Sequence, residues 1–355
     1  MNLTIPSRTL LDALSAIQGC LRKTNNALLR AGVSLELIAS DDENTLSILV
    51  PADVTSPSAI LVDGRHLFQI AKSLPTGTVT LATDDKFKLS IDCAPASFKI
   101  HGEDPANAQE MPSLETHETF TPANLHRLIE QVAFGIPALD NRYGLNGAHF
   151  ENSEDMLRLV STDGSRLQYA EGPFSGTLKV PGKMLISRRT LQEIRKMPAP
   201  LTLGFLSRSL VIRSANVTLH AHLIDGEFPP YRRVLPTGTS KRTILVDRIR
   251  LVEALKRVSL EAQDKASTVR IVFDREELTI SARSIEHGEA SHPVPVDMTG
   301  EAITMGFNVV YLIEALAVIA TEQVRIGLDE ALSPCLIYPV GDESALFVVM
   351  PIRLE

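Results

Sequence analysis

The chain contains no tryptophan, only three cysteines, and no apolar run as long as a membrane-spanning helix requires. Cys20, Cys93 and Cys335 are widely separated and odd in number, so they predict neither a disulfide framework nor a zinc site. The first residues, Met1 to Pro6, lack the basic and then apolar layout of a secretion signal. We therefore expect a protein that stays in the cytoplasm.

The sequence also lacks the motifs that usually accompany catalysis. Its nine histidines and 43 acidic residues form no H-E-x-x-H pattern, and there is no C-x-x-C, nucleophile elbow or Gly-x-Gly phosphate loop. Two acidic clusters, at residues 41–43 and 84–85, precede strand-like runs and fit turns better than a metal site. We expect no catalytic residue, no cofactor and no metal, and hence no enzyme.

What the sequence does contain is an internal repeat of roughly 60 residues. Each copy begins with a short apolar run, continues through a polar, proline or glycine break, and ends with apolar residues at helical spacing. Six helices are predicted in this way, at 6–18, 63–74, 121–132, 186–197, 246–258 and 306–318, and the first leucines of their apolar faces are Leu10, Leu67, Leu125, Leu191, Leu251 and Leu312. The predicted N-caps are Ser7, Asp63, Ser187 and Asp247.

Short alternating runs between the helices predict antiparallel strands, at 78–81, 88–91, 201–205, 210–212, 217–220, 269–273 and 277–280. Two repeats, each a strand, a helix and a small meander, then make one α+β domain whose helices cover one face of its sheets. Polar linkers near 112–116 and 237–240 divide the chain into three tandem domains, at residues 1–115, 116–240 and 241–355.

The net charge of −8 argues against nucleic acid as a partner if it is taken as a whole. The six helical segments nevertheless hold twelve basic and seven acidic residues, a net of +5, so the remainder of the chain carries −13. Any amphipathic helix has Lys and Arg on its wet face, which explains one basic helix but explains six copies less well. The segregation favours a surface that meets the phosphates of duplex DNA without reading its bases.

Three stretches combine apolar residues with Arg, Gly and Pro near strand ends, at residues 157–167, 225–236 and 347–354. They contain S-T-D-G-S-R-L, D-G-E-F-P-P-Y-R-R-V-L-P and V-V-M-P-I-R-L. Such a composition fits a pocket for another protein's side chains better than a reaction centre. In this order and at these spacings the motifs resemble the bacterial DNA polymerase III beta subunit, the replicative sliding clamp, most strongly from about Phe120 to the C-terminus.

The resemblance implies three tandem domains of the DNA-clamp (processivity) fold, which close into a ring as a head-to-tail homodimer. Such a ring encircles duplex DNA without sequence specificity and tethers the DNA polymerase III alpha subunit for processive synthesis. It also implies a hydrophobic cleft in which that polymerase, the clamp loader and repair proteins insert a short Leu/Phe-containing peptide.

Matched residue by residue, the resemblance assigns the cleft to Leu145, Thr162, Gly164, Arg166, Leu167, Pro229, Arg233, Val234, Val348, Val349, Met350, Pro351, Ile352 and Arg353. The DNA contacts that it implies are Arg22 or Lys23, Arg65, Arg142, Tyr143 and Arg189. The dimer contacts that it implies are Phe98, Ile100 and Leu260.

In chemical terms, Leu167, Val234, Val348 and Met350 would supply an apolar floor that adapts to several peptides. Arg166, Arg233 or Arg353 could meet an acidic residue of the peptide. Taken singly, however, the apolar residues fit an ordinary core, and residues 163–164 fit a plain hairpin turn.

A second interpretation stays open from the sequence. The chain could be an enzyme that reused the clamp fold, or a divergent paralogue that acts as a monomeric peptide-binding adaptor without ring closure. The mass in solution separates the two interpretations, because the adaptor is a monomer at micromolar concentration.

Overall fold

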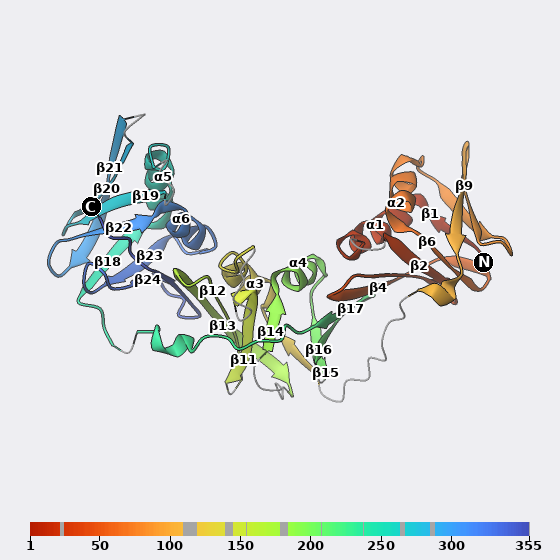
Figure 1. Ribbon diagram of the computed structural model, residues 1–355, viewed down its shortest axis with the longest axis horizontal. Helices are drawn as coiled ribbons and strands as arrows, with labels where there is room; N and C mark the ends of the chain where they lie inside the picture. Colours follow the sequence, from red (N-terminus) through yellow and green to blue (C-terminus); the bar gives the residue numbers. More distant parts are fainter. Residues whose placement is uncertain are drawn as a thin grey trace. The chain divides into compact units, whose positions relative to one another are not determined.

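The computed structural model describes residues 1–21, 25–108, 119–138, 145–153, 155–177, 184–206, 208–236, 238–262, 267–284 and 288–354. In these ranges the chain forms six α-helices, one in each predicted repeat (Figure 1). They are α1 (Ser7–Ile17), α2 (Gly64–Ser73), α3 (Leu125–Ala133), α4 (Arg188–Lys196), α5 (Arg248–Val258) and α6 (Val309–Ala317). The six leucines that were aligned to define the repeat are all buried, none being more than 5% exposed. The repeat is therefore confirmed, and its helices pack through the predicted faces.

The predicted N-caps are confirmed at two helices. Asp63 accepts a hydrogen bond from the His66 amide, and Asp247 accepts one from the Arg250 amide, each at 2.8 Å. Ser7 is wrong as a cap, because the N-cap position of α1 is Pro6, without a capping side chain, and the Ser7 hydroxyl accepts from the Gly77 amide at 3.2 Å. Asn308 is a further cap that was not predicted: its side-chain oxygen accepts hydrogen bonds from the amides of Val310 and Tyr311, two and three residues on, at the start of α6.

Contacts between Cα atoms divide the chain into two compact units. The first contains Met1–Ala123, Ser175–Pro181 and Arg189–Leu223, and the second contains Asn124–Phe174, Gly182–Arg188 and Ile224–Glu355. The central segment of the chain thus contributes to both units. The boundaries that we placed at 115/116 and 240/241 stay predictions.

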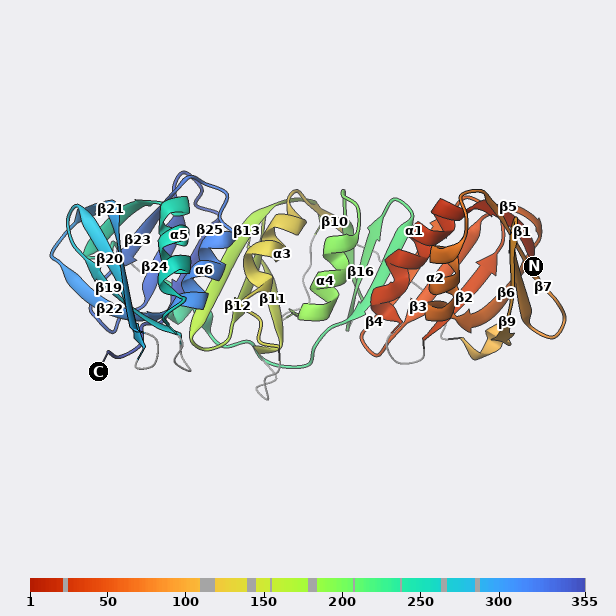
Figure 2. The ribbon, with the colours of Figure 1, turned by 90° about the horizontal axis from the view of Figure 1, so that it is seen from above.

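The first unit is built on two antiparallel sheets. One has the strand order β6–β2–β3–β4–β17–β16–β15–β10; the other has the order β5–β1–β7–β8–β9. Helices α1 and α2 lie side by side over the first of these sheets (Figure 2). The strands are β1 (Asn2–Pro6), β2 (Asn26–Ala31), β3 (Leu35–Ser40), β4 (Asn44–Val50), β5 (Asp53–Ser56), β6 (Ser58–Asp63), β7 (Thr78–Thr83), β8 (Lys88–Cys93), β9 (Ala96–Glu103), β10 (Thr119–Pro122), β15 (Thr202–Leu206), β16 (Ser209–Ser214) and β17 (Val217–His222).

The second unit repeats this plan. One sheet has the order β14–β11–β12–β13–β25–β24–β23–β18–β21, and the other has the order β22–β19–β20–β21. Helices α5 and α6 pack against each other and on these sheets. The strands are β11 (Gly147–Ser153), β12 (Met156–Thr162), β13 (Arg166–Gly176), β14 (Met184–Ser187), β18 (Arg242–Asp247), β19 (Thr268–Phe273), β20 (Glu277–Ser284), β21 (Gly288–Thr299), β22 (Ile303–Asn308), β23 (Gln323–Leu328), β24 (Cys335–Pro339) and β25 (Ala345–Val349).

Each of the seven strand-like runs named from the sequence lies within or overlaps a strand of one unit or the other. The α+β class with antiparallel meanders is therefore confirmed. None of the helices in the described ranges is long and apolar enough to cross a membrane.

Candidate peptide-binding cleft

The cleft begins at the tight turn between β12 and β13. Gly164 has a φ of 92°, a backbone conformation that a side chain would strain. The Asp163 carboxylate accepts hydrogen bonds from the amides of Ser165 and Arg166 at 2.9 and 3.1 Å, as in an Asx turn. The Thr162 hydroxyl closes the turn by donating to the Arg166 carbonyl at 2.6 Å. The turn is therefore held by its own side chains.

The floor of the cleft comes from the strand pair β13–β25. Leu167 lies opposite Val348 in this antiparallel pair, and both side chains are buried, at 4% and 1% exposure. They belong to an apolar cluster in which Phe228 and Tyr231 also take part. After β25 ends, the Met350 amide donates to the Ser165 carbonyl at 2.8 Å, which joins the C-terminal segment to the turn.

The rim comes from the segment that follows β17, with a short 3₁₀ helix at Tyr231–Arg233. Tyr231 is fixed there by Glu151 of β11, whose carboxylate accepts hydrogen bonds from the Tyr231 hydroxyl and, at 2.9 Å, from Arg232. Burial and the bond to Glu151 raise the pKa of Tyr231 to about 12. Burial raises the pKa of Glu151 too, but the hydrogen bonds from Tyr231 and Arg232 outweigh it and leave that pKa below its ordinary value. At neutral pH Glu151 is therefore ionised and the Tyr231 hydroxyl keeps its proton.

Floor and rim enclose a cavity of about 590 Å³. Its lining residues are Leu145, Thr162, Gly164, Arg166, Leu167, Glu227, Pro229, Pro230, Tyr231, Arg233, Val234, Val348 and Met350. Val234 and Met350 are 41% and 38% exposed, in contrast to the buried floor. A space of this size with an apolar floor and an accessible rim lies within the size range of ligand pockets and can hold apolar side chains of a peptide.

Ten of the fourteen residues assigned to the cleft therefore line one cavity, and four do not. Val349 is fully buried on the other side of β25. Pro351 and Ile352 are half-buried. The Ile352 amide donates to the Gly306 carbonyl at 2.7 Å, so this part of the chain follows β22. Arg353 is exposed. Glu227, Pro230 and Tyr231 line the cavity but were missed, although all three stand within the motif at 225–236.

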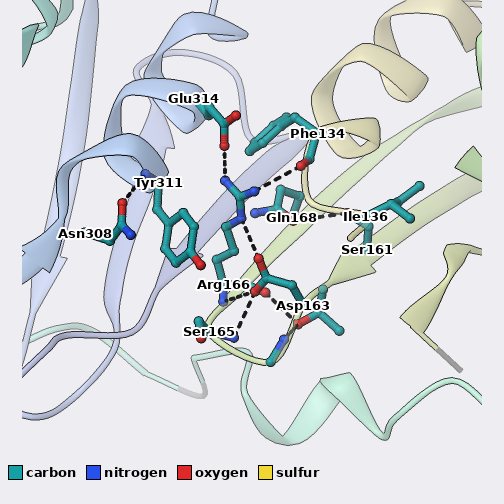
Figure 3. A network of polar contacts seen from close by, with 12 residues as sticks. Phe134, Ile136, Ser161, Asp163, Ser165, Arg166, Gln168, Asn308, Tyr311 and Glu314 are labelled. Carbon is teal, nitrogen blue, oxygen red and sulfur yellow. Dashed lines mark hydrogen bonds and ion pairs between the residues drawn. The ribbon is translucent and has the colours of Figure 1, made fainter. Parts of the chain in front are cut away.

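Arg166 was one of three arginines expected to meet an acidic residue of a peptide, but its side chain bonds to groups of the protein itself (Figure 3). Its Nε donates to Asp163 at 2.9 Å, one terminal nitrogen donates to Glu314 of α6, and the other donates to the Phe134 carbonyl at 3.1 Å. The ring centre of Tyr311 lies 4.3 Å from the guanidinium carbon. The charge of Arg166 is therefore satisfied by partners inside the protein.

The end of α3, which supplies the Phe134 carbonyl, is itself fixed closely to the sheet. The Ser161 hydroxyl donates to the Val132 carbonyl at 2.6 Å. A Cβ atom on Gly135 would lie 1.6 Å from the Gln168 side-chain oxygen, so a larger residue there would have to displace the Gln168 side chain.

The residues expected to contact DNA are partly described. Arg22, Lys23, Arg142 and Tyr143 lie outside the described residues, so their predicted role stays a prediction. Arg65 is exposed on α2 and lines a second cavity of about 610 Å³ together with Arg195 and Lys196 of α4. Arg189 is half-buried and pairs with the buried Asp41 at 2.5 Å, which offsets its charge locally.

The residues expected at a dimer interface lie on β9 and after α5. Phe98 is half-buried opposite Ile91, and Ile100 is 9% exposed opposite Leu89. Leu260 is 69% exposed. Their role in dimer formation stays a prediction.

The three cysteines are buried free thiols. Within the described residues, no three His, Cys, Asp or Glu side chains come together in an arrangement that could hold a metal ion.

Comparison with known proteins gives matches along the full length. The family models of the N-terminal, central and C-terminal domains of the DNA polymerase III beta subunit match residues 1–115, 119–230 and 232–353. The chain belongs to the beta-subunit family of DNA polymerase III, the bacterial sliding clamps. The match at 1–115 shows that membership extends to the part of the chain where the motifs were weakest.

Individual relatives agree with this assignment. The beta sliding clamp of Pseudomonas putida is 31% identical over the full length of both chains, and that of Haemophilus influenzae is 30% identical over the same extent. A crystal structure of the DNA polymerase III beta subunit of Pseudomonas aeruginosa matches with a TM-score of 0.92 and 29% identity, again covering all of both chains. The three-domain clamp fold is therefore shown.

Proposed function

We propose that this chain acts as the sliding clamp of a bacterial replicase. Two copies join head to tail in a closed ring around duplex DNA, in the cytoplasm, and the ring tethers the DNA polymerase III alpha subunit for processive synthesis. The clamp loader and repair proteins use the same ring. The chain supplies no catalytic group, since its part is to hold the polymerase on its template.

The observation that carries this proposal is the cavity between the β12–β13 turn, the end of β25 and the 225–236 segment. Three motifs that are more than 180 residues apart at their extremes meet there, and they form an apolar floor of Leu167 and Val348 under a rim of Val234 and Met350. A short peptide with Leu and Phe side chains fits this combination because its apolar side chains leave water on a preformed surface.

The DNA contact of the proposal is electrostatic. The helices expose more bases than acids although the chain is acidic, and exposed Lys and Arg side chains attach to phosphates without fixing a register. A ring held by such contacts can slide.

The decisive experiment loads the protein onto a nicked circular DNA with a clamp loader and then linearises the DNA. A closed ring is retained on the circle and leaves through the ends after cutting. Retention on the linear DNA would show groove binding instead. No retention on the circle, together with a monomeric mass at micromolar concentration, would support the adaptor interpretation.

A further inference from the structure

One charged group in the cleft has its donors directed into the protein. The Arg166 side chain is 9% exposed and bonds to Asp163 in its own turn, to Glu314 in α6 and to the carbonyl of Phe134 just after α3 (Figure 3). Two aromatic rings, those of Tyr311 and Phe134, lie within 5.4 Å of its guanidinium carbon. All three acceptors and both rings belong to the same unit as the cleft.

These bonds act on the shape of the cleft through the turn. Thr162 and Gly164 line the cavity, and the same Asp163 that bonds to the guanidinium also accepts the amides of Ser165 and Arg166. The Arg166 side chain therefore ties this turn to two helices that do not line the cavity. If the guanidinium were released, the turn would keep the hydrogen bonds from its own amides to Asp163 but would lose the side-chain bonds to the Phe134 carbonyl, just after α3, and to Glu314 of α6.

We propose that Arg166 is a positioning residue, which holds the 162–166 turn in its peptide-accepting place and makes no charge contact with the peptide. The inference rests on the proposed function of the cleft. A guanidinium that is buried and already paired gains little from a peptide carboxylate, because an existing charged bond would have to break. Arg233, exposed on the rim of the same cavity, is the arginine placed to meet an acidic residue.

The test uses Glu314→Gln in the full chain, because the Glu314 side chain is 41% exposed and the change removes a charge without removing bulk. Calorimetry compares two Leu/Phe-containing peptides that differ only by Asp or Asn at one position. We expect the variant to bind both peptides about three- to tenfold more weakly, because the neutral hydrogen bond that Gln can still accept is about half as strong as the charged one. The ratio of the two affinities should stay that of the wild type.

A changed ratio would overturn the proposal. If Glu314→Gln raises the preference for the Asp peptide over the Asn peptide by more than about twofold relative to wild type, the released guanidinium contacts the peptide. Equal affinity of variant and wild type for both peptides would overturn it as well, because the bond would then not position the turn.

Matched variants separate the roles of the two arginines. Arg233→Gln should weaken the Asp peptide selectively, whereas Arg166→Gln should weaken both peptides equally and should make the further change Glu314→Gln ineffective. The opposite pattern, with the ratio lost in Arg166→Gln and kept in Arg233→Gln, would refute the inference.

A thermal melt precedes these measurements, and if Arg166→Gln does not fold, Glu314→Gln decides alone. A wild-type protein that binds neither peptide would overturn the proposed cleft itself, so calorimetry on the wild type comes before any variant is made.

Discussion

Met350 and Leu167 line the same cavity, but they should respond to alanine in different ways. Met350 is 38% exposed in the free protein, and a bound peptide would cover this remaining part. Full burial of such a side chain is worth about 1.5–3 kcal/mol, so the covered part corresponds to about 0.6–1.1 kcal/mol, or about three- to sevenfold in Kd. Leu167 is 4% exposed and packs in the apolar cluster under the cleft. Its truncation leaves a cavity and should lower the free energy of unfolding by about 2–5 kcal/mol.

Calorimetry with a Leu/Phe peptide and urea unfolding measure the two effects separately. Met350→Ala should lose affinity while lowering the free energy of unfolding less than Leu167→Ala does, by about 1–2 kcal/mol for the part of Met350 that is already buried. Leu354 is 39% exposed, as much as Met350, but does not line the cavity, so Leu354→Ala is the matched control and should bind the peptide like wild type. Unchanged affinity in Met350→Ala, or equal losses in Met350→Ala and Leu354→Ala, would refute the reasoning.

Three further predictions concern stability and reactivity. Burial lowers the pKa of His149 below its ordinary 6.5, so the folded protein favours the neutral imidazole. The free energy of unfolding should therefore fall as the pH drops below 6.5. Urea titrations at a series of pH values measure this fall, and His149→Gln should remove part of it. Burial raises the pKa of the Cys20 and Cys335 thiols to about 12, so both should resist a thiol reagent at pH 8 until the protein is denatured, and rapid labelling of either in the native state would contradict their burial. Asp247→Ala should cost about 1 kcal/mol of unfolding free energy through the lost cap of α5, whereas Ile249→Ala, at an exposed neighbouring position, should cost less than half as much.

The periodic part of the sequence predicts the fold well because each repeat buries one helical face. Leu10, Leu191 and Leu251 are each within 3% of complete burial, since spacing alone decides which side of an amphipathic helix meets the sheet. Helix ends are harder to predict. Ser7 has the residue type of a cap, but Pro6 precedes it with a φ of −60°, and the serine bonds to Gly77, 70 residues away. A partner at that distance leaves no local signal.

The cleft shows the same division between local and distant information. The motifs predict its floor because Leu167 and Val348 stand in strands whose alternation is visible in the sequence. They do not predict the partners of Arg166, because Phe134 and Glu314 lie 32 and 148 residues from it. Nor do the motifs show that the last residues leave the cleft and follow β22. Ile352 can lie there because residue 306 is glycine: a Cβ atom on Gly306 would lie only 2.7 Å from the Ile352 carbonyl oxygen.

Burial decides which of the charged residues on the six helices reach the surface of the folded protein. Three of the twelve helical bases are half-buried and donate to internal partners, Arg188 and Arg248 to backbone carbonyls and Arg189 to Asp41. When exposure is taken over the whole residue, three of the seven helical acids are likewise buried or half-buried, namely Glu193, Asp247 and Glu314. The exposed remainder is nine bases and four acids, a net of +5, the same as before burial is considered. The first unit carries +3 of this on α1, α2 and α4, and the second carries +2 on α3, α5 and α6. Because folding removes both signs equally, the positive charge that phosphates would meet is a property of the surface and not only of the sequence.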